Sequence, residues 1–326
     1  MAAKITPEYT DLLNQAVERE FQVSIQYFLQ HAKMEKLKQR KIPENILLDK
    51  TVYDVFGKTL HEISIHEMKH AADIMERIYY LGGEATTKSK QPQIGNSISE
   101  FAKLGASAEE EALMLYRKII EMSGQLGDWE TRQLFEKIYK DEEAHLFKFQ
   151  EYTAFKDETE EPYRVPMPEW RKIFTDDYIA LLNKAVAAEI AGIIQYTNQH
   201  EKAALLELRM RKTPLEAIQD SNTAEVVSKI LKDISMIEMK HLEMISERIY
   251  LIEGEAATNP EPLPMVGETV FDMLRFDHAL ESTAISLYRE IIAEALKRGD
   301  TTTRLMFEKI VTQEEEHFWT FDDFVK

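Results

Sequence analysis

The stretch IHEMKHAADIMERIYYLGGEA at residues 65–85 recurs 171 positions later as IEMKHLEMISERIYLIEGEA at residues 237–256. Both copies contain Glu-Met-Lys-His, in which the glutamate precedes the histidine by three residues. Apolar residues within the stretch follow the spacing of one helix face, as Ile74, Ile78 and Leu81 do at i, i+4 and i+7. The repeat predicts an amphipathic helix that occurs once in each half of the chain and carries a Glu–His pair.

The rest of the chain repeats in the same order. EREFQVSIQYFLQH (18–31) matches AAEIAGIIQYTNQH (187–200) at an offset of 169, and RQLFEKI (132–138) matches RLMFEKI (304–310) at an offset of 172. The offset changes so little that the halves are collinear copies of one unit. Between them FKDETEEPYRVPMPEW (155–170) is charged and contains three prolines, which is typical of a linker. We predict domains at residues 1–156 and 171–326 and a linker at 157–170.

Glycine, proline and capping residues mark the ends of the predicted helices. Gly127 followed by Asp128 joins a helix-ending glycine to the N-cap of the next helix. Pro43 and Pro214 are expected to begin the second helix of each half. The predicted helices cover residues 7–40, 44–81, 98–124 and 129–154 in the first half, and 175–210, 215–252, 268–297 and 301–324 in the second.

The connections between these helices indicate the fold class. No part of the sequence shows the turn signals of a β-hairpin. The segments 82–97 and 253–267, between the second and third helices, are too long for tight turns. We therefore predict an all-α protein of two tandem four-helix bundles, each with a long crossover between helices two and three.

Composition excludes several kinds of chemistry. The 326 residues include no cysteine, which rules out disulfides, thiolate nucleophiles and cysteine-ligated zinc or iron–sulfur clusters. A net charge of -18 argues against a nucleic-acid partner, and either concentrates cations or only aids solubility. The sequence has no membrane-spanning apolar run and no secretory signal at its start, so we expect a cytoplasmic protein without a membrane partner.

Glutamate stands three residues before four of the nine histidines. These pairs fall once on each predicted second helix and once on each predicted fourth helix. Residues i and i+3 share a helix face, so each pair directs two metal ligands to one place. The pairs are Glu67–His70, Glu142–His145, Glu238–His241 and Glu314–His317.

Two metal ions in one bundle would need further carboxylates from the remaining helices. On the first helix Glu20 is repeated as Glu189, whereas the candidate Glu18 is replaced by Ala187. The duplication therefore selects Glu20 and Glu189.

On the third helix Glu109, Glu110 and Glu111 compete for the same role. Only Glu109 is repeated, as Glu281. The alternative, that these groups merely pair in a metal-free core, is unfavourable because unpaired buried carboxylates cost several kcal/mol each. The predicted ligands are Glu20, Glu67, His70, Glu109, Glu142 and His145 in the first half, and Glu189, Glu238, His241, Glu281, Glu314 and His317 in the second.

Tyr27 and Tyr196 follow the first-helix glutamates by seven residues, on the same interior face. Each tyrosine either donates an electron or a hydrogen bond at the metal site, or is a core residue whose hydroxyl is satisfied elsewhere. His31 and His200 lie four residues further on, where we expect a structural role or a weak accessory site.

In combination these motifs resemble bacterioferritin. The resemblance rests on the first-helix glutamate with IQYF, on EMKH followed by ERI, on MVGETVFDMLRFDHALE with LYRE, and on DEEAH, and it covers all four helices of both halves. It implies ferritin-like bundles in which the glutamates and Glu-x-x-His pairs form a di-iron ferroxidase centre. There iron(II) is oxidised by oxygen or peroxide and stored as ferric mineral in a hollow shell.

The resemblance also gives a role to the methionine between the paired Glu and His. In bacterioferritins this residue is a haem ligand, one from each of two paired bundles, which implies that Met68 and Met239 bind a porphyrin within one chain or between chains. Each follows its glutamate by one residue, about 100° around the helix, and so faces away from the metal site. A thioether at a seam between bundles also suits ordinary packing.

Full-length bacterioferritins carry a short fifth helix, which we do not expect here because the fourth helix of the first half runs into the linker. The sequence resembles the shorter mini-bacterioferritins, with shells of twelve bundles and, in some, iron-coproporphyrin in place of haem b, which implies six chains here. The residue before the fourth-helix glutamate is Asp141 in one half and Gln313 in the other. If this residue orients a histidine, the two sites should oxidise iron(II) at different rates.

The leading hypothesis is a haem-bearing ferroxidase that stores iron. The same ligands would serve a di-manganese or di-iron catalase or oxidase that stores nothing. A third interpretation is a porphyrin carrier whose metal sites are vestigial, although both ligand sets are complete. A rubrerythrin is excluded because the cysteines of its rubredoxin part are missing.

Overall fold

The computed structural model describes residues 6–39, 46–155, 169–210 and 217–325, and in these residues it contains helices and no strand. The predicted all-α fold class is confirmed. The α-helices are α1 (Pro7–Gln39), α2 (Ile46–Leu81), α3 (Ile98–Leu126), α4 (Trp129–Gln150), α5 (Asp176–Met210), α6 (Ala217–Leu251), α7 (Val270–Arg298) and α8 (Thr301–Val325), with a short 3₁₀ helix, η1 (Glu169–Ile173), before α5.

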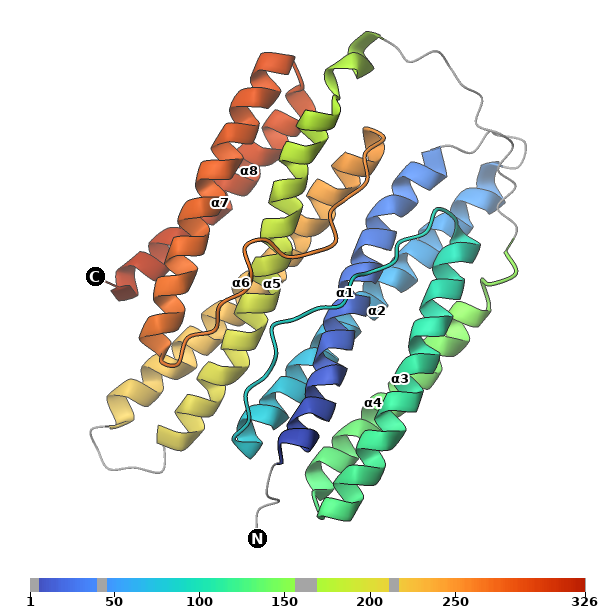
Figure 1. Ribbon diagram of the computed structural model, residues 1–326. Helices are drawn as coiled ribbons and strands as arrows, with labels where there is room; N and C mark the ends of the chain where they lie inside the picture. Colours follow the sequence, from blue (N-terminus) through green and yellow to red (C-terminus); the bar gives the residue numbers. More distant parts are fainter. Residues whose placement is uncertain (1–5, 40–45, 156–168, 211–216, 326) are drawn as a thin grey trace. The chain divides into compact units, whose positions relative to one another are not determined.

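The chain divides into two compact units, residues 1–162 and 163–326. In the first unit α1 packs along α2 and α3 packs along α4, and in the second α5 and α6 form one pair and α7 and α8 the other (Figure 1). Each unit is therefore a four-helix bundle. Most of the predicted linker, residues 157–168, lies outside the described residues, and position 171 lies inside η1.

The predicted junction between the third and fourth helices is present in the first unit. Gly127 adopts the left-handed conformation with φ of 70°, which glycine tolerates because it has no Cβ. The carboxylate of Asp128 then accepts the backbone N–H of Thr131 at 3.2 Å. The predicted helix starts at Pro43 and Pro214 fall outside the described residues.

A buried carboxylate ties this junction to the rest of the first unit. Asp128 accepts hydrogen bonds from Arg77 of α2 at 2.5 Å and from the Tyr9 hydroxyl of α1 at 3.0 Å. The side chain of Asp128 thus links α1, α2 and α4, and its backbone N–H donates to the carbonyl of Ser123 in α3. Asp300 has the same partners in the second unit, Arg248 and Tyr178.

The crossover of the first unit lies against α1, where side-chain amides bind its backbone (Figure 1). Asn14 accepts the N–H of Thr86 at 2.8 Å and donates to the carbonyl of Glu84 at 3.0 Å. Further along α1, Gln26 accepts the N–H of Gln93 at 3.1 Å. These bonds satisfy backbone groups of a segment that has no regular structure of its own.

The second unit uses the same residues for its crossover. Asn183 accepts the N–H of Ala257 at 2.6 Å and donates to the carbonyl of Glu255 at 2.9 Å. Gln195 accepts the N–H of Met265 at 2.8 Å. The duplication thus preserves the groups that fasten the crossover, as well as the helices.

An apolar core fills one end of each bundle and packs against the predicted site tyrosine. Burying such side chains contributes roughly 1.5–3 kcal/mol each. The cores include Tyr27, Phe56, Phe101 and Phe149 in the first unit, and Tyr196, Val227, Leu274 and Phe321 in the second.

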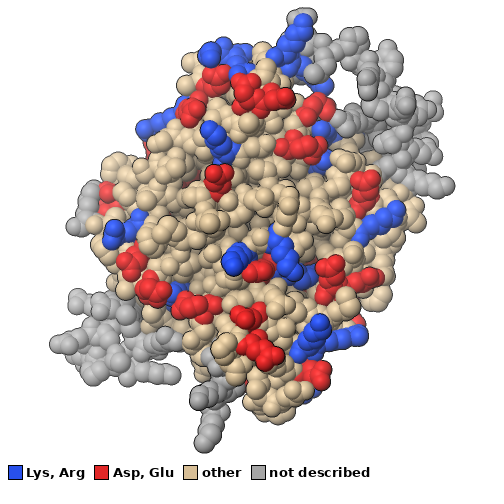
Figure 2. Space-filling view, in the orientation of Figure 1, with Lys and Arg blue, Asp and Glu red and all other residues tan. Residues whose placement is uncertain are grey.

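Among the described residues no helix is both long and apolar enough to cross a membrane. On the face shown in Figure 2, acidic and basic side chains are interspersed. This distribution differs from the clustered basic surface by which proteins neutralise phosphates.

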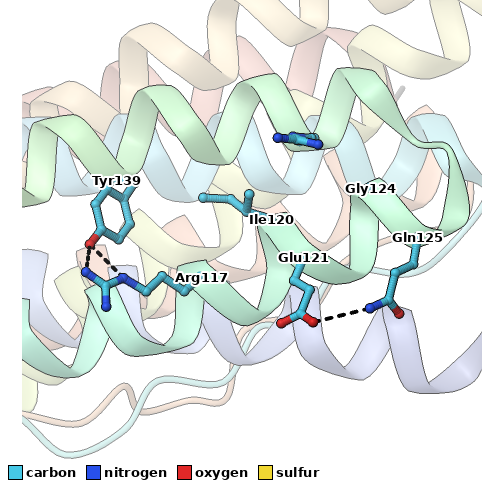
Figure 3. A pocket seen from close by; sticks show the side chains of 7 residues that line it. Arg117, Ile120, Glu121, Gly124, Gln125 and Tyr139 are labelled. Atoms are coloured by element: carbon cyan, nitrogen blue, oxygen red, sulfur yellow. Dashed lines mark hydrogen bonds between the residues drawn. The ribbon is translucent and has the colours of Figure 1, made fainter.

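A hollow lies on the surface of the first unit between α3 and α4 (Figure 3). Its polar side chains bind one another: Arg117 donates to the Tyr139 hydroxyl at 2.6 and 2.8 Å, and Gln125 donates to Glu121 at 3.3 Å. The hollow contains none of the predicted metal ligands.

We expect Asp128→Ala to lower the free energy of unfolding by about 2–4 kcal/mol, because it removes an N-cap and the acceptor of Arg77 and Tyr9. Hydrogen exchange should accelerate at the α3–α4 junction and stay unchanged at the α7–α8 junction. Glu130→Ala, at an exposed neighbour, is the matched control. Equal hydrogen-exchange rates at the α3–α4 junction in both variants would contradict the assignment of Asp128 as the residue that links the helices there.

Candidate metal centres

The structure brings the six predicted ligands of the first unit together from four helices. Helices α1 and α3 contribute one glutamate each, and α2 and α4 contribute one Glu–His pair each. All six side chains are buried. They are Glu20, Glu67, His70, Glu109, Glu142 and His145.

These residues form two overlapping groups that share two carboxylates. One group is Glu67 and Glu142 with Glu20 and His70, and the other is Glu67 and Glu142 with Glu109 and His145. Within each group the potential ligand atoms all lie within 4.8 Å of one another. The overlap would suit two metal ions, with Glu67 and Glu142 available to both.

The oxygens of the two shared glutamates are divided between the histidines. From His70 Nδ1, Glu67 Oε2 is 3.1 Å away and Glu142 Oε1 is 3.2 Å away. From His145 Nδ1, Glu67 Oε1 is at 2.8 Å and Glu142 Oε2 at 3.3 Å. Each shared carboxylate therefore presents one oxygen to each histidine.

The second unit repeats this geometry. Glu238 and Glu314 are common to its two groups, which are completed by Glu189 with His241 and by Glu281 with His317. The distances from each histidine Nδ1 to the shared carboxylates are 2.8 and 3.0 Å for one histidine and 3.1 and 3.3 Å for the other.

Several buried carboxylate oxygens in these clusters lack a well-formed hydrogen bond and have only a histidine Nδ1 at ion-pair distance. Unsatisfied buried carboxylates are strongly unfavourable, and coordination of a cation would relieve this. Oxygen and imidazole donors suit iron, manganese and zinc. The residues present thus fit a pair of divalent metals. The oxygens concerned are Glu20 Oε2, Glu67 Oε1 and Glu142 Oε1 in the first unit, and Glu238 Oε1 and Glu314 Oε1 in the second.

Burial and neighbouring charge change the pKa values of the carboxyls in different directions. Glu20 and Glu109, each of which belongs to one group only, are called the terminal carboxyls, and Glu67 and Glu142, which belong to both, are the shared carboxyls. Burial, together with the charges of Glu142 and Glu67, raises the pKa of Glu20 and Glu109 well above its usual range. Burial also opposes ionisation of Glu67, but His145 holds its pKa well below the usual range. Without metal, Glu20 and Glu109 therefore hold a proton more readily than the shared carboxyls do.

The histidines are held in the charged form by the carboxylates around them. Burial acts against the charge, but the adjacent glutamates raise the pKa of His145 to about 10, of His241 to about 12 and of His317 to about 9. The pKa of His70 is raised by the same causes. In the metal-free clusters the protonated histidines thus balance part of the negative charge of the carboxylates.

Tyr27 and Tyr196 donate hydrogen bonds to the third-helix glutamates. The Tyr27 hydroxyl lies 2.6 Å from Glu109 Oε1, and the Tyr196 hydroxyl lies 2.5 Å from Glu281 Oε1. Of the two roles considered at the metal site, the structure shows the hydrogen bond. Whether either tyrosine donates an electron stays a prediction.

The sequence analysis did not select a second pair of tyrosines, Tyr116 and Tyr288. Tyr116 donates to Glu20 Oε1, and Tyr288 donates to Glu189 Oε1 at 2.5 Å. Tyr116 follows Glu109 by seven residues, the spacing that pointed to Tyr27. Applying that spacing to the third helix would have found both residues.

Arg19 is a further group that the sequence analysis missed. Its guanidinium is buried and donates to Glu109 Oε2 at 2.9 Å and to the carbonyl of Ala108. No pattern in the sequence indicated it, because an arginine next to a ligand is usually solvated and Ala188 takes its place in the second unit.

The residues before the fourth-helix glutamates lie near the Nε2 atoms of the second-helix histidines. Asp141 Oδ2 lies 3.5 Å from His70 Nε2, and Gln313 Oε1 lies 3.2 Å from His241 Nε2. His66, a residue the sequence analysis did not use, places its Nδ1 3.4 Å from the Nε2 of His145.

The remaining predicted residues lie outside the clusters. His31 Nδ1 is 2.8 Å from the carbonyl of Gly57, and His200 Nδ1 is 2.7 Å from the carbonyl of Ser228, which supports a structural role. Met68 and Met239 are buried and belong to neither group of potential ligands.

Comparison with known proteins agrees with this geometry. The family model of the ferritin-like domain matches residues 10–155 and again 215–326. The chain belongs to the ferritin-like family. Both matches cover helices that carry the clusters, so each unit is a ferritin-like domain.

The ferritin-like chain is similar to several bacterioferritins. It is 29% identical to bacterioferritin from Desulfovibrio desulfuricans over 145 residues, which make up 44% of this chain and 72% of that protein. It is 28% identical to that of Brucella melitensis over 141 residues, which make up 43% of this chain and 79% of the relative. Each match spans less than half of the chain and most of the relative, as a tandem duplication requires.

Two solved bacterioferritin structures are also similar to this ferritin-like chain. The D. desulfuricans structure, described with its diiron site in different catalytic states, matches at 25% identity and a TM-score of 0.41, over 48% of this chain and 82% of that one. The Rhodobacter capsulatus structure, described with a metal-free dinuclear site and a heme iron, matches at 26% identity and a TM-score of 0.40, over 46% and 86%.

We expect metal loading to release protons, because the raised pKa values of the histidines and terminal glutamates mean that the metal-free clusters are protonated at neutral pH. Affinity for zinc(II) should therefore fall as pH falls below about 9. Calorimetry in buffers of different ionisation enthalpy measures the protons released. Zinc binding with no proton release and no dependence on pH would contradict this electrostatic description.

Proposed function

We propose that the protein oxidises iron(II) at a two-metal centre in each bundle and stores the product as ferric iron. The observation that carries this proposal is the pair of overlapping ligand groups with two shared carboxylates, present in both units. Two metals bridged in this way can pass two electrons to one molecule of oxygen or peroxide. Hard carboxylate oxygens also favour the iron(III) that results.

Each side chain has a distinct part in the first unit. Glu67 and Glu142 would hold both metals, and each metal would also be held by one glutamate and one histidine, Glu20 with His70 and Glu109 with His145. The hydroxyls of Tyr116 and Tyr27 fix the orientation of the two terminal carboxylates, so that they need not reorganise when iron enters.

Storage requires a container, and we propose a hollow homo-oligomeric shell of six chains, which supplies twelve bundles. The similarity to proteins named bacterioferritin supports this proposal. Size-exclusion chromatography with light scattering measures the assembly. A monomer or dimer that turns over without forming mineral would instead indicate the non-storage oxidase or catalase.

We expect Glu67→Gln and Glu238→Gln each to abolish iron oxidation in one unit, and the double variant to lower the initial rate at least about 100-fold. A glutamine keeps the shape of a shared ligand but removes the charge that bridges two metals. Oxygen uptake and ferric absorbance after anaerobic loading with iron(II) are the measurements. Glu110→Gln, at an exposed neighbour of Glu109, is the control.

The oxidation proposal is wrong if the unmodified chain, loaded with iron(II), consumes neither oxygen nor peroxide. It is also wrong if the double variant oxidises iron as fast as the unmodified chain.

We further propose that Met68 and Met239 hold a haem b or an iron-coproporphyrin between paired bundles. The thioether of methionine is a suitable axial ligand of haem iron. The two residues occupy equivalent positions in the units and lie outside both metal clusters. The similarity to bacterioferritins supports the assignment, and the porphyrin iron would supply an electron-transfer centre there.

For this cofactor we expect the combined Met68→Leu and Met239→Leu variant to lose the Soret band while keeping its zinc affinity, because leucine preserves packing but cannot ligate iron. Visible spectroscopy of the purified chain measures the band. Met114→Leu, at an exposed position, serves as the control. An intact Soret band in the double variant would remove the axial assignment.

A further inference from the structure

The two centres of one chain differ in a buried charge. Arg19 precedes the ligand Glu20 on α1, and its side chain turns inward, so that only 5% of the residue is exposed. Nη2 donates to Glu109 Oε2 at 2.9 Å, and Nη1 lies 3.8 Å from Glu20 Oε1. The Nε and Nη1 groups have no hydrogen-bond acceptor. A guanidinium therefore lies beside a proposed metal ligand with part of its donor capacity unused.

The arginine is permanently charged in this position. Burial alone would disfavour the cation, but the carboxylates of Glu109, Glu20 and Glu142 outweigh burial and raise its pKa. The centre of the Tyr116 ring lies 5.9 Å from the guanidinium carbon. The charge thus cannot be relieved by loss of a proton and is held among the ligands.

The second unit has no such charge at the equivalent place. Ala188 precedes Glu189 as Arg19 precedes Glu20, and an alanine cannot reach the third helix of the bundle. Glu281, the counterpart of Glu109, keeps its hydrogen bond from Tyr196. Its ion pair among the described residues is with His317, at 3.7 Å.

The extra positive charge of Arg19 changes the charge balance of the first centre. Four ionised glutamates in one centre carry four negative charges, which two divalent ions neutralise. In the first unit Arg19 adds one positive charge, and a divalent ion at the Glu109–His145 position would lie beside it in a poorly screened interior. Asp141 adds a negative charge, but it contacts His70 at the other position and its side chain is 33% exposed.

We propose that Arg19 makes the Glu109–His145 position the weakest of the metal positions in the chain, so that the first bundle binds its two metals unequally while the second fills both of its positions first. This inference rests on the proposed two-metal function. Arg19 acts through Glu109: the guanidinium donates a hydrogen bond to this carboxyl group, and an ion bound by Glu109 would have to share the group with that positive charge.

Cobalt(II) tests the proposal without any redox step. The full-length chain carries Glu238→Ala and Glu314→Ala, which removes the shared carboxylates of the second unit, and is titrated under equilibrium dialysis and visible spectroscopy. We expect one tight and one weak cobalt in this chain. Adding Arg19→Gln should tighten the weak step at least tenfold, whereas Arg19→Lys, which retains the charge, should leave it weak.

The reverse substitution in the other unit provides a matched control. In a chain that carries Glu67→Ala and Glu142→Ala, Ala188→Arg should weaken one of the two cobalt steps at least tenfold. In an otherwise unmodified chain, Arg19→Gln should leave the two second-unit steps unchanged, which shows that the fold is intact.

Two equal cobalt steps in the first unit would overturn the inference and leave the two-metal function standing. Equal gains from Arg19→Gln and Arg19→Lys would also overturn it, since packing rather than charge would then be responsible. A chain that binds no cobalt in either unit would remove the proposed function itself.

Discussion

The burial of four carboxylates at the centre of each bundle is the constraint on which the rest of this structure depends. No helical bundle would keep such groups in its interior without compensating cations, because each bare charge costs several kcal/mol. In the metal-free protein protons on the histidines provide part of that compensation. The tyrosines, the capped junctions and the fastened crossover then hold the cluster in a geometry that two metal ions would complete.

Much of this arrangement could be predicted from the sequence, because the duplication acts as an internal comparison. Glu109 stands among three adjacent glutamates, and only its repetition as Glu281 distinguishes it. The i, i+3 spacing of Glu67 and His70 then fixes their shared helix face. Periodicity and Gly-Asp junctions likewise predicted most helix ends within a few residues; α4, expected to reach residue 154, ends at Gln150.

The rest depends on contacts between helices, which local patterns do not reveal. Tyr116 binds a glutamate of another helix 96 positions away, and Arg19 reaches one 90 positions away. Whether an arginine beside a ligand turns inward depends on whether the neighbouring helix offers a hydrogen-bond acceptor, as α3 does with Glu109. The duplication identifies the residues that both copies share, but it gives no sign of residues that differ between them, such as Arg19 and Ala188. Yet the unequal residues are those that give the two centres different electrostatics.

The central claim, a pair of adjacent metal positions in each unit, is tested most directly by anomalous diffraction at the iron edge from crystals loaded anaerobically with iron(II). We predict two peaks in each unit, about 3.5–4 Å apart. In the first unit both should lie between the carboxylates of Glu67 and Glu142, one beside His70 and the other beside His145. A single peak in each unit, or iron bound only outside the carboxylate clusters, would contradict this account.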